Sequence, residues 1–294
     1  MINLIGIILK IISSTFYLFS GIVWKKVIRR NINYRVIYYR SIFSIVSTIL
    51  AILAFEKFNA AEYSIQDFNN GTIFDWFFTL ALCFFSFFGL YYYTNALKVG
   101  RYSFVTPFVS TASVFSFLTA LFFFDQEISL YNISSFCLLT VGVIYHQKDQ
   151  LKEFKLNKEI LLSIFCAFFW GVSFVLYLIP IKKFGVLNFS LILEVCVFFS
   201  AMGILIYKEK KIVPRLLSKK SMKLSSIIGL CVTVGNITAH YALDNMAIII
   251  NIVVALVFEA IMLVVGIKIF KEQFFYKDWV LIVIITLATT LVIF

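Results

Sequence analysis

Two short stretches, Asn95-Ala96-Leu97-Lys98 and Tyr241-Ala242-Leu243-Asp244, occupy matching places in the chain. Each Ala-Leu pair ends a long apolar run and is followed within a few residues by another. The first following run ends at Phe123-Phe124-Asp125-Gln126-Glu127 and the second at Ile269-Phe270-Lys271-Glu272. Repetition on this scale is a signal of the whole fold, so the sequence predicts two similar halves.

The composition predicts that lipid surrounds both halves. Of 294 residues, 62% are hydrophobic and only 14% are charged, whereas a soluble domain is about 45–50% apolar. A helix needs about 20 apolar residues to cross a bilayer. Ten segments have this character: 2–24, 35–55, 73–97, 102–124, 129–146, 158–181, 187–207, 224–244, 247–267 and 276–294.

Five spans in each half predict that the two halves are inverted. The polar stretch 147–158 separates a first repeat, 1–147, from a second, 158–294. Because five is odd, the second repeat enters the membrane from the opposite face, as in many secondary transporters. The predicted fold is therefore an all-α membrane protein of ten transmembrane helices, arranged as two inverted five-helix repeats around a central cavity within one membrane domain.

The distribution of cations predicts the orientation. The face with both termini holds only Lys57, Lys182 and Lys183, while most of the 26 Lys and Arg residues lie on the other face. Cytoplasmic loops are enriched in such residues, so both termini are expected outside, in a plasma (inner) membrane. Topology also explains the net charge of +11, so no nucleic-acid partner is expected.

The segment from Tyr93 to Pro107, Tyr-Thr-Asn-Ala-Leu-Lys-Val-Gly-Arg-Tyr-Ser-Phe-Val-Thr-Pro, resembles the junction of the third and fourth helices in the drug/metabolite transporter superfamily, in its EamA-type branch. Arg40 early in the second span and Trp170-Gly171 in the sixth also fit. The resemblance implies a cavity lined chiefly by the first four helices of each half. It implies transport of a small solute, without specifying which. Many relatives have both termini inside, which differs from the charge count.

Charged and amide side chains within the spans are the first candidates for the cavity, because an intramembrane charge usually faces a cavity or a partner. Glu259 is the deepest, and either accepts a proton, binds a cation, or is a protonated packing residue. Glu194 and His240 form either a proton relay or two unrelated interfacial groups. Asn236 lies four residues before His240 and shares its helix face. Glu194 also stands roughly where Arg40 stands in the first repeat.

Two cations in the first half allow two readings each. Arg40 either attracts an anionic group or extends to the membrane surface. Lys10, well inside the first span, either extends to the membrane surface or reaches the cavity.

Aromatic and hydroxyl side chains complete the predicted cavity. Tyr91 and Asn95 are four residues apart on one face of the third span, and Trp170 and Tyr177 share a face of the sixth. Such side chains line a cavity or belong to an interfacial aromatic belt. Pro107 is expected to kink the fourth span, where Thr106 and Ser113 either satisfy freed backbone groups or line the cavity.

The motifs favour transport over catalysis. The chain has no HExxH, GxSxG or Walker motif, and its five cysteines stand singly. No enzyme activity, metal or cofactor is therefore expected. The predicted function is secondary transport of a small metabolite such as an amino acid, by alternating access. The alternatives are a flippase for a lipid-linked sugar and a non-transporting membrane subunit. The expected partners are the solute, protons as coupling ion, and the lipid bilayer, with the protein as a monomer or homodimer.

Overall fold

The computed structural model describes residues 4–57, 68, 70–109, 111–124, 158–271 and 275–293, together with scattered positions between 130 and 145. Within these ranges the chain is helical apart from short turns and one longer connection at 210–218, and no strand occurs there. The predicted span 129–146 and the divider 147–158 fall largely outside the described residues.

The helices of the first half are α1 (Leu4–Ile28), α2 (Asn33–Lys57), α3 (Ile73–Val99), α4 (Tyr102–Val109) and α5 (Ala112–Phe123). Those of the second half are α7 (Lys158–Leu176), α8 (Leu178–Phe184), α9 (Val186–Glu209), α10 (Lys219–Asn245), α11 (Ile248–Phe270) and α12 (Tyr276–Ile293). By length and composition, six segments of the described chain are suited to crossing a membrane: α1, α2, α3, α7 with α8, α9 and α10. Apart from 129–146, every predicted span coincides with one helix, or with two consecutive helices, of the full set given above.

Two predicted spans are each divided into two helices. The fourth is α4 and α5. The bond that Pro107 removes is the one to the carbonyl of residue 103, within α4, whereas the division lies at Thr111, whose hydroxyl donates to the carbonyl oxygen of Phe108 at 2.6 Å. The sixth span is α7 and α8, divided at Tyr177, where Pro180 cannot donate to the carbonyl of Leu176.

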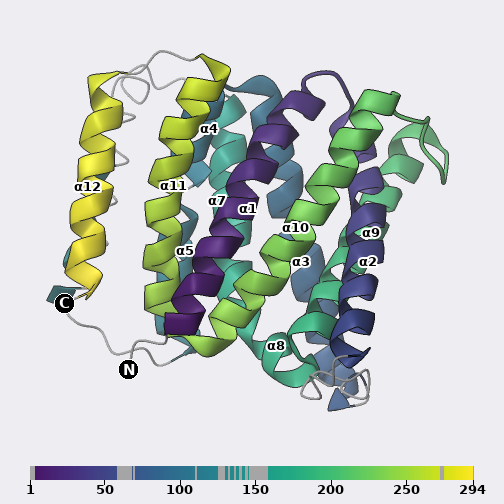
Figure 1. Cartoon of the computed structure of the whole chain (residues 1–294), viewed down its shortest axis with the longest axis horizontal. Coiled ribbons are helices and arrows are strands. Elements are labelled where there is room, and N and C mark those ends of the chain that lie inside the picture. The colour runs from purple at the N-terminus through teal and green to yellow at the C-terminus, as the bar shows by residue number, and fades with distance from the viewer. Residues whose placement is uncertain are drawn as a thin grey trace.

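Helices of one half pack mainly against helices of the other (Figure 1). The most extensive contacts join α1 to α10 and α3 to α7, and others join α2 to α9 and α4 to α11. If each helix is exchanged for its counterpart in the other half, the α1–α10 pair becomes the α7–α3 pair. The α2–α9 and α4–α11 pairs each map onto themselves.

Glycines allow the closest approaches between the halves. A Cβ on Gly89 of α3 would lie 2.3 Å from Cδ1 of Trp170 in α7, and a Cβ on Gly235 of α10 would lie 2.9 Å from Cε1 of Tyr17 in α1. Gly89 lies six residues before Asn95, and Gly235 lies six residues before Tyr241. The two glycines therefore occupy the same position in the two matching stretches.

The two ends of the bundle differ in charge. In Figure 1, α1 begins and α12 ends at the lower edge, where α8 carries Lys182 and Lys183. The opposite end carries the basic turn between α1 and α2. Lys25, the residue directly after the first predicted span, 2–24, is buried in α1, and its Nζ donates to the carbonyl oxygens of Leu97 (2.6 Å) and Gly100. It caps the C-terminus of α3, where backbone carbonyls lack helical partners.

Candidate functional site

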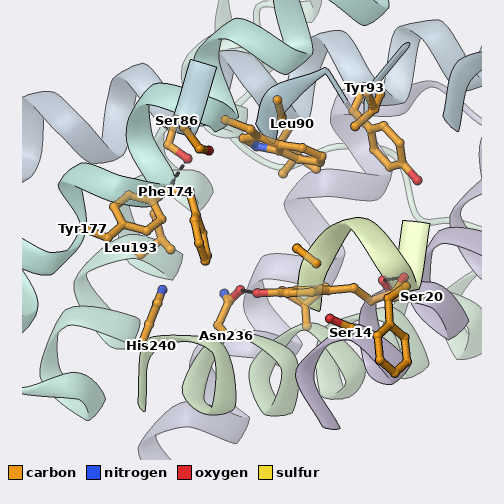
Figure 2. Close-up of a pocket in the computed structure, with 18 of the residues that line it drawn as sticks. Ser14, Ser20, Ser86, Leu90, Tyr93, Phe174, Tyr177, Leu193, Asn236 and His240 are labelled. Carbon is orange, nitrogen blue, oxygen red and sulfur yellow. Dashed lines mark hydrogen bonds between the residues drawn. The ribbon is translucent and has the colours of Figure 1, made fainter. Parts of the chain in front are cut away.

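A cavity of about 310 Å³ lies between the two halves. Its lining comes from α1, α2, α3, α4 and α5 of the first half and from α7, α9, α10 and α11 of the second. Figure 2 shows Ser86 and Leu90 of α3 facing this space from one side, and Asn236 and His240 of α10 pointing into it from the other. The cavity is therefore bounded by the helices that pair across the halves.

A polar network of four helices forms one wall. Arg40 of α2 forms an ion pair with Oε2 of Glu194 in α9, and the two side chains are 4% and 1% exposed. Nδ2 of Asn236 in α10 donates to Oε1 of Glu194 at 2.8 Å, and the hydroxyl of Tyr17 in α1 donates to Oδ1 of Asn236 at 2.6 Å. A buried ion pair is tolerated when further hydrogen bonds satisfy its atoms, and Asn236 supplies one here.

The same network is tied to the backbone beside Arg40. Nη1 of Arg40 donates to the hydroxyl of Ser44 at 3.3 Å, and that hydroxyl donates to the carbonyl oxygen of Gly229 at 3.1 Å. Thr233 of α10 donates to the carbonyl oxygen of Ser44 at 3.2 Å. These bonds hold α2 and α10 together next to the ion pair.

His240 lies in an aromatic part of the wall. Its Nδ1 is 2.7 Å from the hydroxyl of Ser190, and its ring meets Phe189 and Tyr177 with centroid distances of 5.0 and 5.6 Å. The hydroxyl of Tyr177 donates to that of Ser86, a bond drawn in Figure 2. The imidazole is thus oriented by a hydroxyl and enclosed by rings.

Lys10 brings a positive charge to the cavity. Its Nζ lies 4.4 Å from the ring centroid of Phe174, a cation–π contact. The side chain is only 4% exposed and lines the cavity. Lys10 therefore does not extend to the membrane surface, and Arg40, also 4% exposed, does not either.

The break between α4 and α5 adds hydroxyls. Thr106 and Ser113, on either side of it, both line the cavity, and Thr106 also donates to the carbonyl oxygen of Tyr102 at 2.9 Å. Ser116 donates to the carbonyl oxygen of Gly171 at 2.9 Å. Thr106 thus lines the cavity, whereas the carbonyl that Pro107 leaves without a helical partner is that of residue 103 and not that of Tyr102.

A model of the EamA-like transporter family matches residues 4–145. This segment, just under half of the chain, is similar to EamA-like transporters. The match confirms the resemblance read from Tyr93 to Pro107, and the matched family is one of membrane transporters. In the described chain, the EamA-like segment contains α1 to α5.

The similarity extends beyond the EamA-like segment at the level of fold. One solved crystal structure superposes with a TM-score of 0.68 at 11% sequence identity, covering 97% of this chain and 95% of the other. At this identity the likeness concerns the fold alone. No curated protein matches the sequence.

Most of the predicted site residues meet at the cavity. Arg40, Thr106 and Ser113 of the EamA-like segment line it, as do Trp170, Glu194, Asn236 and His240 of the second half. Glu194 is bonded to Arg40 and Asn236, and His240 to Ser190. The structure therefore gives Glu194 and His240 different hydrogen-bond partners and does not pair them with each other.

Two of the predicted residues, Tyr91 and Asn95, are not among the described residues that line the cavity. The side chain of Glu259 lies outside the described part of the structure. Tyr91 and Asn95 are half-buried, and Nδ2 of Asn95 donates to the carbonyl oxygen of Tyr91 at 2.8 Å. On α3 the lining positions are Ser86, Leu90 and Tyr93. Tyr91 is one residue beyond Leu90, which turns its side chain about 100° around the helix.

The structure adds a stripe on α1, of which sequence reasoning had considered only Lys10. Lys10, Ser14, Tyr17, Ser20 and Trp24 all line the cavity. Their spacing of three or four residues places them on one face of a helix, so a polar stripe on an otherwise apolar span was the available signal. No cluster of His, Cys, Asp or Glu able to hold a metal occurs among the described residues.

Proposed function

We propose that the protein is a permease that moves a small solute across the membrane by alternating access of the central cavity. The observation that carries the proposal is the buried Arg40–Glu194–Asn236–Tyr17 network, which joins α1 and α2 of the first half to α9 and α10 of the second. A rocking motion of one half against the other has to rearrange these bonds. The network is thus placed to hold one state until a solute binds.

The proposal includes ten spans in two inverted repeats, residues 1–147 and 158–294. The exchange of packing pairs supports it, because α1–α10 and α3–α7 map onto each other and α2–α9 and α4–α11 onto themselves. The start of α1 and the end of α12 at one edge also support an even number of spans (Figure 1). The positive-inside rule then places that edge outside the cell.

The solute we propose is an amino acid or a related small carboxylate with an apolar body. Lys10 and Arg40 face the cavity against the single described carboxylate of Glu194 in its lining. Nε of Arg40 is buried without a hydrogen-bond partner among the described residues, so an anionic group that reached it would satisfy a donor. Trp24, Trp170 and Phe174 supply apolar walls, and about 310 Å³ is at the lower end for small-molecule sites.

The test is solute counterflow in proteoliposomes with a panel of labelled amino acids and neutral analogues. Lys10→Met removes the cation while keeping an apolar stem. We expect roughly tenfold or greater weakening for carboxylate solutes, because a charge-assisted hydrogen bond is worth about 1.5–3 kcal/mol. Lys26→Met is the matched control, since Lys26 lies on the same helix and is exposed.

Two results would overturn this proposal. One is transport by Lys10→Met at the wild-type rate and KM. The other is the absence of saturable exchange for every soluble solute, combined with translocation of a lipid-linked sugar, which is the behaviour of a flippase.

Proton coupling is a separate part of the proposal and concerns Glu259 and Glu194. Glu259 lies in the middle of α11, where a carboxylate is costly unless it has a function or a partner. Glu259→Gln is expected to remove the dependence of transport on a pH gradient while leaving exchange intact. Identical pH profiles for the Gln variant and the wild type would eliminate the role of Glu259.

A further inference from the structure

A second hollow, of about 410 Å³, opens at the basic end of the bundle. It lies between the α1–α2 turn, the last turn of α3 and the connection 210–218 that joins α9 to α10. Five of its lining residues are cations: Arg29, Arg30, Arg35, Lys98 and Arg215. The hollow is distinct from the central cavity, with which it shares no described lining residue.

The cations of this hollow are poorly balanced by acidic groups. Nε of Arg35 pairs with Oε1 of Glu209 at 2.6 Å, which neutralises one of them. No carboxylate is among the described lining residues, and Arg29, Arg30, Lys98 and Arg215 are exposed. Like charges gathered around one concave space favour an anion there, and arginine suits the phosphate group in particular.

The connection beside the hollow carries exposed apolar side chains. Ile212, Val213 and Leu216 are 66%, 63% and 77% exposed. In Figure 1 this green connection projects at the upper right of the bundle. The hydroxyl of Tyr39 donates to the carbonyl oxygen of Pro214 at 3.1 Å. Since Tyr39 lies about 9 Å along α2 from its start, the connection is held against the side of a membrane helix.

We propose that this hollow binds the phosphate headgroup of an anionic phospholipid, with the acyl chains beside Ile212, Val213 and Leu216. The cations suit the phosphate headgroup of a lipid at a membrane interface, and the exposed apolar side chains next to them suit its acyl chains. A soluble phosphate would use the cations but would gain nothing from the apolar connection. The apolar side chains therefore favour the lipid over a free anion.

The experiment measures retention of phosphatidylglycerol and phosphatidylcholine on the full-length protein by native mass spectrometry in detergent. The test variant is Arg29→Gln/Arg30→Gln/Arg215→Gln, which leaves the Arg35–Glu209 pair intact. The matched control is Lys219→Gln/Lys220→Gln/Lys223→Gln, which removes three charges from the same end outside the hollow.

We expect the preference of the wild type for phosphatidylglycerol to fall about a hundredfold in the arginine variant, since each cation near an anionic surface contributes about fivefold. The control is expected to lose less than tenfold. Arg29→Lys/Arg30→Lys/Arg215→Lys keeps the charge and is expected to retain at least a tenth of the preference. This variant tests the site even if the glutamine variant does not fold.

A second arm separates lipid from free phosphate. Ile212→Ser/Val213→Ser/Leu216→Ser is expected to weaken retention of phosphatidylglycerol without changing thermal protection by inorganic phosphate. Equal losses in the arginine variant and the lysine control would overturn the proposal, because binding would then follow total charge. Millimolar phosphate displacing the lipid fully, together with no effect of the serine variant, would assign the hollow to a soluble anion and overturn it as well.

Discussion

The two most extensive interfaces between the halves, α1–α10 and α3–α7, become each other when the halves are exchanged, but their side chains differ. The α1–α10 interface is polar: Ser13 donates to the carbonyl oxygen of Gly235 at 2.9 Å, and Tyr17 to Asn236. The α3–α7 interface consists of aromatic side chains. The ring centroid of Phe169 lies 4.5 to 5.7 Å from those of Phe85, Phe88 and Tyr92.

This difference separates two roles within one architecture. Aromatic packing is tolerant of direction and is not lost when one contact shifts, whereas hydrogen bonds between buried groups are made or broken. We therefore expect the α1–α10 side to control the state of the permease and the α3–α7 side to keep the halves together. The following predictions test that division, starting with the largest effect.

Arg40→Met is expected to have the largest effect, because it breaks the ion pair between α2 and α9 that Asn236 links to the α1–α10 interface. It leaves Glu194 as an unpaired buried charge, which costs about 3–5 kcal/mol of unfolding free energy. Arg40→Met/Glu194→Gln removes both charges and is expected to recover at least half of that loss. Denaturant unfolding in detergent gives both values. Equal stability of the single and double variants would mean that the pair is not a buried ionic unit.

Gly89→Ala is expected to cost about 1–3 kcal/mol by overpacking the aromatic side. Its Cβ would lie 2.3 Å from the ring of Trp170, compared with 2.9 Å from the ring of Tyr17 for Gly235→Ala. Gly235→Ala should therefore be the milder variant. Thermal unfolding measures both, and adding Trp170→Leu should restore Gly89→Ala. A larger loss for Gly235→Ala would reverse the comparison.

Phe169→Leu is expected to lower stability by about 1.5 kcal/mol, because it removes several aromatic pairs at the α3–α7 interface. Transport per folded molecule should remain near the wild-type value. Unfolding and counterflow assays on the same preparation give the two numbers. A loss of transport without loss of stability would show that this interface does more than hold the halves together.

Tyr17→Phe is expected to have the smallest effect on stability, about 1 kcal/mol, since it removes one hydrogen bond. Its effect on transport should exceed that of Phe169→Leu, because the hydroxyl of Tyr17 bonds Asn236 within the network that joins the halves. Counterflow rates compared at equal protein amounts measure this. If Tyr17→Phe transports as the wild type does, the polar side does not control the cycle.

Hydropathy predicted the helices well because length and apolar character are local properties. It did not predict which helices face one another. Arg40 and Glu194 were recognised as equivalent positions in the two repeats, but not as partners, because periodicity within one helix carries no information on the neighbouring helix. The same limit led to a pairing of Glu194 with His240, where the structure has Asn236 and Ser190 as their partners.

Small rotations account for other differences at the site. Tyr91 and Asn95 belong to the correct helix and depth but to a different face from Leu90. A kink at Pro107 was expected, but the division of the fourth span lies farther on, at Thr111, beyond the bond that the proline removes. The burial of Lys25 under the end of α3 was not expected, since a lysine at the end of an apolar run is typical of a surface residue.

The glycines at positions 89 and 235 also lead to a prediction about natural variation. Since Gly89 accommodates the ring of Trp170 and Gly235 that of Tyr17, a relative with a larger residue at either position should carry a smaller one at the partner position. The two positions in each pair should therefore change together among homologues, while residues 89 and 235 remain free to vary independently of each other. Such paired substitutions would record the contact between the halves in sequences alone.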